Sequence, residues 1–271
     1  MDYKKELEFA KTLSREAGSI MRHYFLSEDA DVQTKGDKTL VTIADTTINK
    51  LVIDSVKATF PDHSVWGEEE CHLVDGSNFT WVCDPVDGTM PFAKGLPIST
   101  FSLALVDGSG TPVVGVVFDP YNNRLYSAVK GQGAFLNGKK IAVSEKNTLG
   151  NAYIDQELWI NEKEGVSFDD PKDTLNKLGA KITVQCSFVI IGCLVAGSQY
   201  DAALFGQSKP EDIAAVYVIV TEAGGKVTDL LGREQRYDQQ IYGAIVSNGK
   251  IHDDLVKITS NMNYESKYVK R

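Results

Sequence analysis

The sequence predicts a mixed α/β fold made of two packed subdomains, residues 1–150 and residues 151–271. Three observations support this prediction. Apolar residues recur at helical spacing over the first 60 positions, apolar runs of strand length follow up to about residue 144, and strand and helix patterns alternate beyond residue 150. A chain of 271 residues is long enough to bury a large core in one domain or in two subdomains.

Two amphipathic helices are expected at the start of the chain. The first 26 residues form one long helical pattern, and a second runs from about Ile43 to Thr59 and ends before Pro61, which cannot continue a helix. Polar residues 27–39 between them predict a loop. Strands are then expected at residues 64–66, 80–83, 99–106 and 113–119.

Residues 124–144 predict a β-meander that contains a misleading motif. Residues 133–139 match the start of a phosphate-binding P-loop, G-x-x-x-x-G-K, but Lys140 stands where that motif requires Ser or Thr. Asn137-Gly138 favours a tight hairpin turn, whereas a P-loop opens a helix. We therefore predict a hairpin here and no phosphate loop.

Strands and helices are expected to alternate in the second subdomain. The predicted strands are residues 184–189, 201–205, 226–229 and 244–247. The predicted helices are residues 192–200, 212–223 and 253–258. Gly224-Gly225 supplies a stop signal for the middle helix.

Composition limits the partners of this chain. A net charge of -9 argues against a nucleic acid or an anionic membrane as partner, and a phosphorylated substrate would be repelled unless bound cations reversed the local field. The longest apolar runs are too short to span a bilayer, and no signal-like segment precedes them. The four cysteines show no C-x-x-C spacing and predict reduced thiols, so we expect a cytoplasmic protein.

The most informative segment is the turn that follows the apolar residues Trp81-Val82-Cys83. Asp84 and Asp87 lie three residues apart on it, and carboxylate oxygens are the ligands that Mg²⁺ prefers. Gly88 has no Cβ, so the backbone amides of Gly88 and Thr89 can approach a phosphate closely. The turn therefore suggests metal-assisted phosphate chemistry. An acidic surface turn is the alternative interpretation, because Asp, Pro and Gly are common in turns.

Three further acidic positions share this ambiguity. Residues 68–70 are all Glu and follow a predicted strand, where a solvated acidic run is the simpler interpretation. Asp212 lies at a predicted helix start, where Asp is a common cap. Asp45 lies one turn into the second helix, a position that also suits a surface residue.

Taken together, three blocks resemble the signature of the inositol monophosphatase family, a group of Mg²⁺-dependent, lithium-sensitive phosphatases. The blocks are residues 67–69 (Gly-Glu-Glu), residues 84–89 (Asp-Pro-Val-Asp-Gly-Thr), and residues 212–225, which begin Asp-Ile-Ala-Ala and end Glu-Ala-Gly-Gly. Supporting similarity extends over residues 35–45, 92–105 and 131–138, and over Cys193-Leu194-Val195-Ala196 with Asp201.

The resemblance implies a five-layered αβαβα sandwich, and homodimerisation is usual in the family. It also implies two or three Mg²⁺ ions and lithium inhibition. Its metal ligands fall on the side chains of Glu68, Asp84, Asp87 and Asp212 and on the carbonyl oxygen of Val86. Such ions lower the pKa of a bound water and hold the phosphate for in-line attack.

The catalytic and substrate-binding residues also follow from the resemblance. Glu68 and Thr89 would position the attacking water, with Asp45 bonded to the Thr89 hydroxyl, and the amides of Gly88 and Thr89 would hold the phosphate oxygens. The substrate pocket would be lined by Gly88, Thr89, Cys186, Ser187, Phe188, Phe205 and Asp212. None of the four histidines falls in a signature block, and we interpret them as surface or structural residues.

The residues that would recognise the alcohol depart from the family pattern. Phe205 replaces a Glu that bonds a substrate hydroxyl in inositol-preferring members, and Cys186-Ser187-Phe188 replaces a smaller segment. We therefore expect hydrolysis of a small phosphorylated metabolite, of which inositol phosphate is one candidate. Histidinol phosphate is a second, because Lys-Pro-x-Asp at residues 209–212 resembles the approach to the third metal ligand in some histidinol phosphatases, and other sugar or nucleotide phosphates stay open. The alternative from another class is a catalytically idle Mg²⁺-binding regulatory protein.

Overall fold

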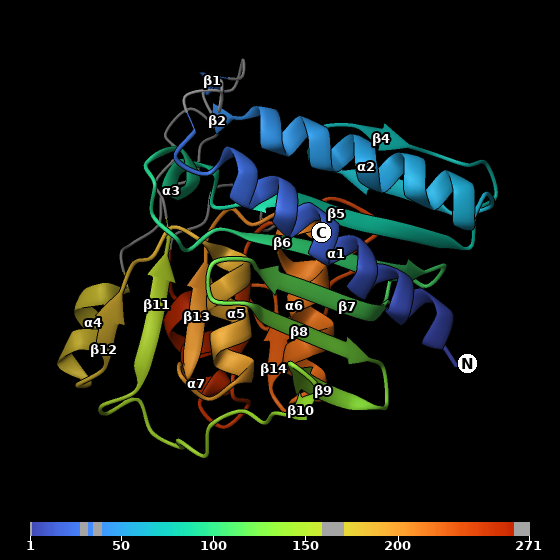
Figure 1. Cartoon of the computed structure of the whole chain (residues 1–271). Helices are drawn as coiled ribbons and strands as arrows, with labels where there is room; N and C mark the ends of the chain where they lie inside the picture. The colour runs from blue at the N-terminus through green and yellow to red at the C-terminus, as the bar shows by residue number, and fades with distance from the viewer. Residues whose placement is uncertain (1, 28–31, 35–39, 159–170, 263–271) are drawn as a thin grey trace.

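The computed structural model describes residues 2–27, 32–34, 40–158 and 171–262. Its helices and two large β-sheets form alternating layers (Figure 1). Helices α1 (Lys4–Tyr24) and α2 (Ile43–Thr59) cover one face of an eight-stranded sheet. Between this sheet and a five-stranded sheet lie α5 (Phe188–Ala196) and α6 (Pro210–Glu222), and α4 (Lys172–Lys177) and α7 (His252–Ser260) pack on the far face of the second sheet. The predicted αβαβα sandwich is confirmed.

The first sheet has the strand order β10-β9-β8-β7-β6-β5-β3-β4. Its strands are β3 (Ser64–Gly67), β4 (Cys71–His72), β5 (Phe79–Asp87), β6 (Thr100–Asp107), β7 (Pro112–Asp119), β8 (Arg124–Val129), β9 (Gly133–Leu136) and β10 (Lys139–Lys140). All neighbours are antiparallel except β3 and β5, which run parallel with Gly67 opposite Cys83. Because parallel strands end at the same edge of a sheet, the residues that follow β3 and those at the end of β5 are brought together.

The second sheet has the order β12-β11-β13-β15-β14. Its strands are β11 (Tyr153–Glu157), β12 (Lys181–Thr183), β13 (Ala202–Phe205), β14 (Lys226–Thr228) and β15 (Ala244–Ser247). The chain passes from the first sheet to the second between Lys140 and Tyr153. The subdomain boundary predicted near residue 150 lies in this connection, and the division itself stays a prediction.

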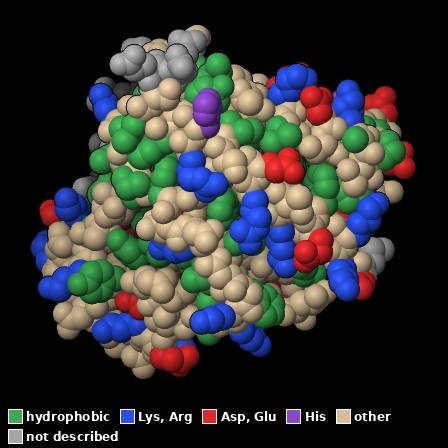
Figure 2. Space-filling model, viewed as in Figure 1, with side chains coloured by type: hydrophobic (Ala, Val, Ile, Leu, Met, Phe, Trp, Pro, Cys, Tyr) green, Lys and Arg blue, Asp and Glu red, His purple; other side chains and the backbone are tan. Residues whose placement is uncertain are grey.

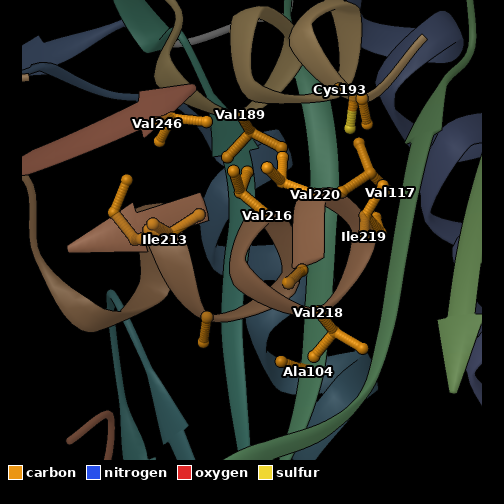
Figure 3. Packing of buried hydrophobic residues seen from close by; sticks show 14 of the residues in the cluster. Ala104, Val117, Val189, Cys193, Ile213, Val216, Val218, Ile219, Val220 and Val246 are labelled. Carbon is orange, nitrogen blue, oxygen red and sulfur yellow. The ribbon is translucent and has the colours of Figure 1, made fainter. Parts of the chain in front are cut away.

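Close packing of α6 against its neighbours depends on two glycines. A Cβ at Gly192 of α5 would lie 2.3 Å from Cγ1 of Val216, and a Cβ at Gly115 of β7 would lie 2.7 Å from the carbonyl oxygen of Ala215. Around these contacts, Val189 of α5, Val216 of α6 and other buried apolar side chains fill the space between the sheets (Figure 3). The glycines thereby fix the position of α6, whose first turn carries Asp212.

One predicted strand was wrong, and several short elements in both halves of the chain were not predicted. The strand expected at residues 184–189 is not formed, because β12 ends at Thr183 and α5 begins at Phe188. Helix α5 is buried almost all round, and an apolar run of that kind has no periodicity that separates strand from helix. Also unpredicted were α3 (Thr89–Ala93), α4, β4, β11, and the two-stranded sheet of β1 (Gln33–Thr34) and β2 (Leu40–Val41), which lies partly in the predicted loop.

The hairpin expected at Asn137-Gly138 is confirmed. Strands β9 and β10 pair antiparallel on either side of it, and both turn residues have positive φ, 48° for Asn137 and 78° for Gly138. Within the described residues no helix is both long enough and apolar enough to cross a membrane. Figure 2 shows acidic and basic side chains interspersed over the face in view, without a continuous patch of one sign.

Candidate metal and phosphate site

Asp84 and Asp87 lie on the same side of β5 because the strand is irregular between them. In a regular strand, residues three apart point to opposite faces of the sheet. The pairing of β5 with β6 runs in register down to Asp84 opposite Ser102, then shifts, and resumes with Asp87 opposite Thr100. A bulge of this kind redirects side chains, and carboxylate oxygens of both residues lie within 4.8 Å of each other.

Asp212 completes a cluster with these two carboxylates. One oxygen atom from each of Asp84, Asp87 and Asp212 lies within 4.8 Å of the other two, and all three side chains are buried. Asp212 occupies the third position of α6, where its Oδ2 accepts a hydrogen bond of 2.6 Å from the backbone amide of Lys209. The alternative prediction, Asp212 as the N-cap, is wrong: Lys209 is the N-cap, Asp212 bonds back to it, and the second oxygen of Asp212 remains available for a cation.

The cluster is electrostatically unfavourable in the absence of a cation. Burial raises the pKa of Asp84 and of Asp212 well above the ordinary value, and the neighbouring carboxylates raise both further. Burial also raises the pKa of Asp87, to about 6, although hydrogen bonds from Ser187, Val189 and Phe188 oppose the increase. A divalent cation would relieve this repulsion, and oxygen-only ligands suit Mg²⁺ or a similar hard ion. The residues present therefore fit the implied metal.

A second acidic group lies beside the first. Oxygens of Asp45, Glu68 and Glu69 also lie within 4.8 Å of one another. Asp45 is completely buried, and its Oδ2 accepts a hydrogen bond of 2.8 Å from the backbone amide of Thr42, the N-cap residue that precedes α2. Burial raises the pKa of Asp45 to about 7, and the charges of Glu68 and Glu69 add to the rise. Asp45 is not the surface residue that helix position alone allowed.

The turn at Gly88-Thr89 joins the two groups. Gly88 has a φ of 77°, a conformation that favours glycine, and a Cβ there would lie 3.3 Å from the carbonyl oxygen of Cys186. The Thr89 hydroxyl lies 3.2 Å from the carbonyl oxygen of Val86 and 3.4 Å from Oδ1 of Asp45, and both oxygens can accept its hydrogen bond. The contact between Thr89 and Asp45 that the resemblance implied is therefore one of two that this hydroxyl can make.

These residues surround one cavity of about 430 Å³. Its lining includes Glu68, Asp84, Val86, Asp87, Gly88, Thr89, Cys186, Ser187, Phe188 and Asp212, which were all predicted site residues, together with Leu40, Met90, Pro91 and Glu157, which were not. The cavity lies where the end of β5 meets the start of α5 and the start of α6, so both halves of the chain contribute to it.

Two predicted site residues do not line the cavity. Asp45 lies behind Thr89, as described above. Phe205, at the end of β13, is fully buried and packs behind Phe188, with 4.8 Å between the ring centroids. A role for Phe205 in substrate binding stays a prediction, and the structure connects it to the cavity through Phe188.

Glu157 is the functional candidate that sequence reasoning missed. It lies at the end of β11, a strand that was not predicted, and only 1% of its surface is exposed. Burial raises its pKa to about 8, and the adjacent carboxyl of Asp155 adds to the rise. The strand sequence Tyr-Ile-Asp-Gln-Glu is mostly polar, so it gave no signal of burial.

No histidine is among the described residues that line the cavity. His252 is buried between the hydroxyl groups of Ser247 and Thr228, at 2.7 and 3.0 Å, and His63 stacks on Phe60 with centroids 4.9 Å apart. The structural interpretation of these two side chains is confirmed.

Comparison with known proteins gives one consistent result. Residues 2–264 match the model of the inositol monophosphatase family. A fructose-1,6-bisphosphatase/inositol-1-monophosphatase of Aquifex aeolicus is 33% identical, over 94% of this chain and 95% of that protein. A histidinol-phosphatase of Chlorobaculum parvum is 30% identical, over 94% and 97%. The solved structure of a Thermotoga maritima IMPase has a TM-score of 0.83 at 31% identity, over 94% of this chain and 97% of that one.

Proposed function

The chain belongs to the inositol monophosphatase family and is a phosphoric monoester hydrolase, and we propose that it uses Mg²⁺ to hydrolyse the phosphate ester of a small alcohol. The observation that carries the proposal is the buried cluster of Asp84, Asp87 and Asp212, whose oxygens lie within 4.8 Å of one another. Buried carboxylates at this separation are stable as anions only beside a cation. A phosphate needs the same cation, because the described part of the cavity lining contains no basic side chain.

The ligands of the cation would be Glu68, Asp84, Asp87 and Asp212, with the carbonyl oxygen of Val86. Bound there, Mg²⁺ would neutralise the phosphate and increase the acidity of the attacking water. All five residues line the same cavity, and Asp212 reaches it from the second half of the chain. Lithium inhibition and the number of ions are part of the proposal, on the family resemblance alone.

Thr89 and Asp45 would orient the attacking water. When the Thr89 hydroxyl donates its hydrogen bond to Oδ1 of Asp45, 3.4 Å away, its oxygen is free to accept a hydrogen bond from the attacking water. Glu68 lines the same cavity and would hold the water from the other side. The amides of Gly88 and Thr89 would donate to the phosphate oxygens, at a turn where the absence of a Cβ permits close approach.

The test is release of inorganic phosphate from a panel of inositol, sugar, histidinol and nucleotide monoesters, with Mg²⁺ and with EDTA. We expect turnover of at least one ester that depends on Mg²⁺ and is lost in Asp212→Asn. Glu145→Gln is a matched control, because it also removes one carboxylate, at an exposed position that is not part of the cavity lining. Turnover that survives EDTA or Asp212→Asn would contradict the metal site.

A histidinol phosphate ester is the second candidate substrate. It is favoured by the similarity to the Chlorobaculum parvum histidinol-phosphatase, which extends over 94% of this chain. A catalytically idle regulatory protein is less consistent with the site, since every ligand position implied by the family carries an oxygen donor. Absence of turnover on all esters, with Mg²⁺ binding retained, would favour that alternative.

The proposal also covers the oligomeric state and the cellular location. We propose a homodimer in the cytoplasm, on the family resemblance and on the reduced state of the thiols, none of which forms a disulfide in the described residues. Light scattering coupled to size exclusion would measure the mass. A monomer at micromolar concentration would contradict the dimer.

A further inference from the structure

Glu157 lines the cavity but belongs to neither acidic group of the metal site. It stands at the end of β11, next to the segment Cys186-Ser187-Phe188 that lines the part of the cavity assigned to the alcohol. Its Oε1 accepts a hydrogen bond of 3.2 Å from the backbone amide of Ser187. The carboxyl group is therefore fixed in position, at the edge of a cavity where a substrate would bind.

A second buried carboxyl group accompanies it. Asp155 lies two residues earlier on the same strand, so its side chain is on the same face of the sheet. Its Oδ2 accepts a hydrogen bond of 2.6 Å from the Thr183 hydroxyl, and the carboxyl groups of Asp155 and Glu157 are hydrogen-bonded to each other, which requires a proton on one of them. No Lys, Arg or His among the described residues forms an ion pair with either carboxyl group. Buried acids usually have such a partner.

The charge of the cavity favours a cationic partner. Five of its described lining residues are acidic, and none is basic: Glu68, Asp84, Asp87, Glu157 and Asp212. Four of these are assigned to the metal, and Glu157, whose pKa is raised to about 8, is left at the alcohol end with a bound proton in place of a cationic side chain. The adjacent Phe188 ring is half-buried and adds an aromatic face, a surface that also attracts cations.

We propose that Glu157 determines specificity by binding an ammonium group on the alcohol, so that the substrate class is the phosphate monoester of a small amino alcohol. This inference rests on the proposed phosphatase function. An ammonium group donates three hydrogen bonds, and its charge can replace the proton that the two carboxyl groups share. A neutral hydroxyl would supply one hydrogen bond and no charge, so it could not replace that proton.

The test uses three esters of almost equal size: 2-aminoethyl, 2-hydroxyethyl and propyl phosphate, followed by the same series with three- and four-carbon chains. For wild-type protein with Mg²⁺, we expect kcat/KM for the best amino ester to exceed that of its methyl counterpart by about 10- to 100-fold, the range for a hydrogen bond between charged groups. Glu157→Gln should abolish this preference through KM and leave the propyl esters within about threefold of wild type.

The possible outcomes distinguish a failure of this inference from a failure of the proposed function. Turnover of all three esters without preference for the ammonium group, or a preference that Glu157→Gln leaves intact, overturns the role of Glu157 while the phosphatase stands. A preference for the hydroxyl ester that Glu157→Gln retains overturns the ammonium assignment, because an amide oxygen still accepts from a hydroxyl group. Absence of turnover on every ester, including those of the earlier panel, contradicts the proposed function itself. Glu145→Gln is again the control for a lost charge, and a melting temperature no lower than wild type verifies that Glu157→Gln folds.

Discussion

The carboxylate of Asp87 accepts a hydrogen bond of 3.2 Å from the backbone amide of Val189, which lies a hundred residues later in the chain. The amide of Phe188, at 3.1 Å, and the hydroxyl of Ser187 donate to the same carboxylate. These amides belong to the first turn of α5, which has no side-chain cap of its own. Asp87 is therefore both a predicted metal ligand and the cap of a helix in the other half of the molecule.

This double role predicts different effects for two substitutions at Asp87. Asp87→Asn keeps one acceptor for the α5 amides but loses the charge, so we expect turnover with Mg²⁺ to fall by about a hundredfold or more. In EDTA, its free energy of unfolding should equal or exceed that of wild type, because one of several repelling charges is gone. Asp87→Ala also removes the cap and should lose about 1–2 kcal/mol relative to Asp87→Asn. Urea unfolding in EDTA measures the difference, and equal stability of the two variants would contradict the cap.

Thr89 should contribute its hydroxyl group to catalysis and little to stability. Thr89→Val preserves the shape but removes the contacts with Val86 and Asp45, so we expect kcat to fall by about 10² to 10⁴. Thr89→Ser retains the hydroxyl and should remain within about tenfold of wild type. Steady-state kinetics with Mg²⁺ on the best ester provides the measurement. Comparable activity of the Val and Ser variants would exclude the hydroxyl from the mechanism.

The stability of the metal-free protein should decrease as pH rises. The pKa values of Asp45, about 7, and Glu157, about 8, lie above those of carboxyl groups in an unfolded chain. The folded state therefore binds more protons, and the stability that these groups contribute is complete below about pH 4 and is lost toward pH 8. We expect a loss of at least about 2 kcal/mol between pH 5 and pH 8 in EDTA. Mg²⁺ should offset much of it at pH 8, and a melting temperature in EDTA that rises over this range would contradict the burial of these acids.

Gly115 should tolerate no side chain. Ala at this position would place its Cβ 2.7 Å from the carbonyl oxygen of Ala215, a backbone atom of α6 that cannot move without shifting the helix. We expect Gly115→Ala to lower the free energy of unfolding by about 1–3 kcal/mol, as overpacked cores do. Gly108→Ala is the matched control, because its nearest neighbour is 3.6 Å away, and it should remain within about 0.5 kcal/mol of wild type. Equal stability of the two variants would show that α6 adapts.

Much of the secondary structure could be predicted from hydrophobic periodicity and from residues that favour turns. Helix α2 has the bounds predicted for it, because its apolar spacing and the following proline are both local signals. The same is true of β15 and of the hairpin at Asn137-Gly138. Helix α5 was predicted to begin four residues late and a strand was placed over its start, since a segment buried between two sheets shows no amphipathic period.

The part of the site that forms one short sequence motif could be predicted. The part that depends on the pairing of distant strands could not. Asp84, Asp87 and Thr89 lie within six residues of sequence, at the end of β5 and the start of α3, and they line one cavity with Asp212. Glu157 depends on the parallel pairing of β11 with β13, which brings it beside Phe205, and on α5, which brings Ser187 onto its carboxylate. Such non-local contacts cannot be predicted from the spacing of the residues around Glu157.

Asp87 is both a proposed metal ligand and the cap of α5, and this double role has a consequence for folding during synthesis. A nascent chain emerges from its N-terminus, so Asp84 and Asp87 are synthesised well before α5 and Asp212 exist. Until then the turn offers two carboxylates without the third, and the helix that Asp87 caps has not been made. We therefore expect a ribosome-bound fragment ending near residue 150, which lacks Asp212, to bind Mg²⁺ far more weakly than the full chain.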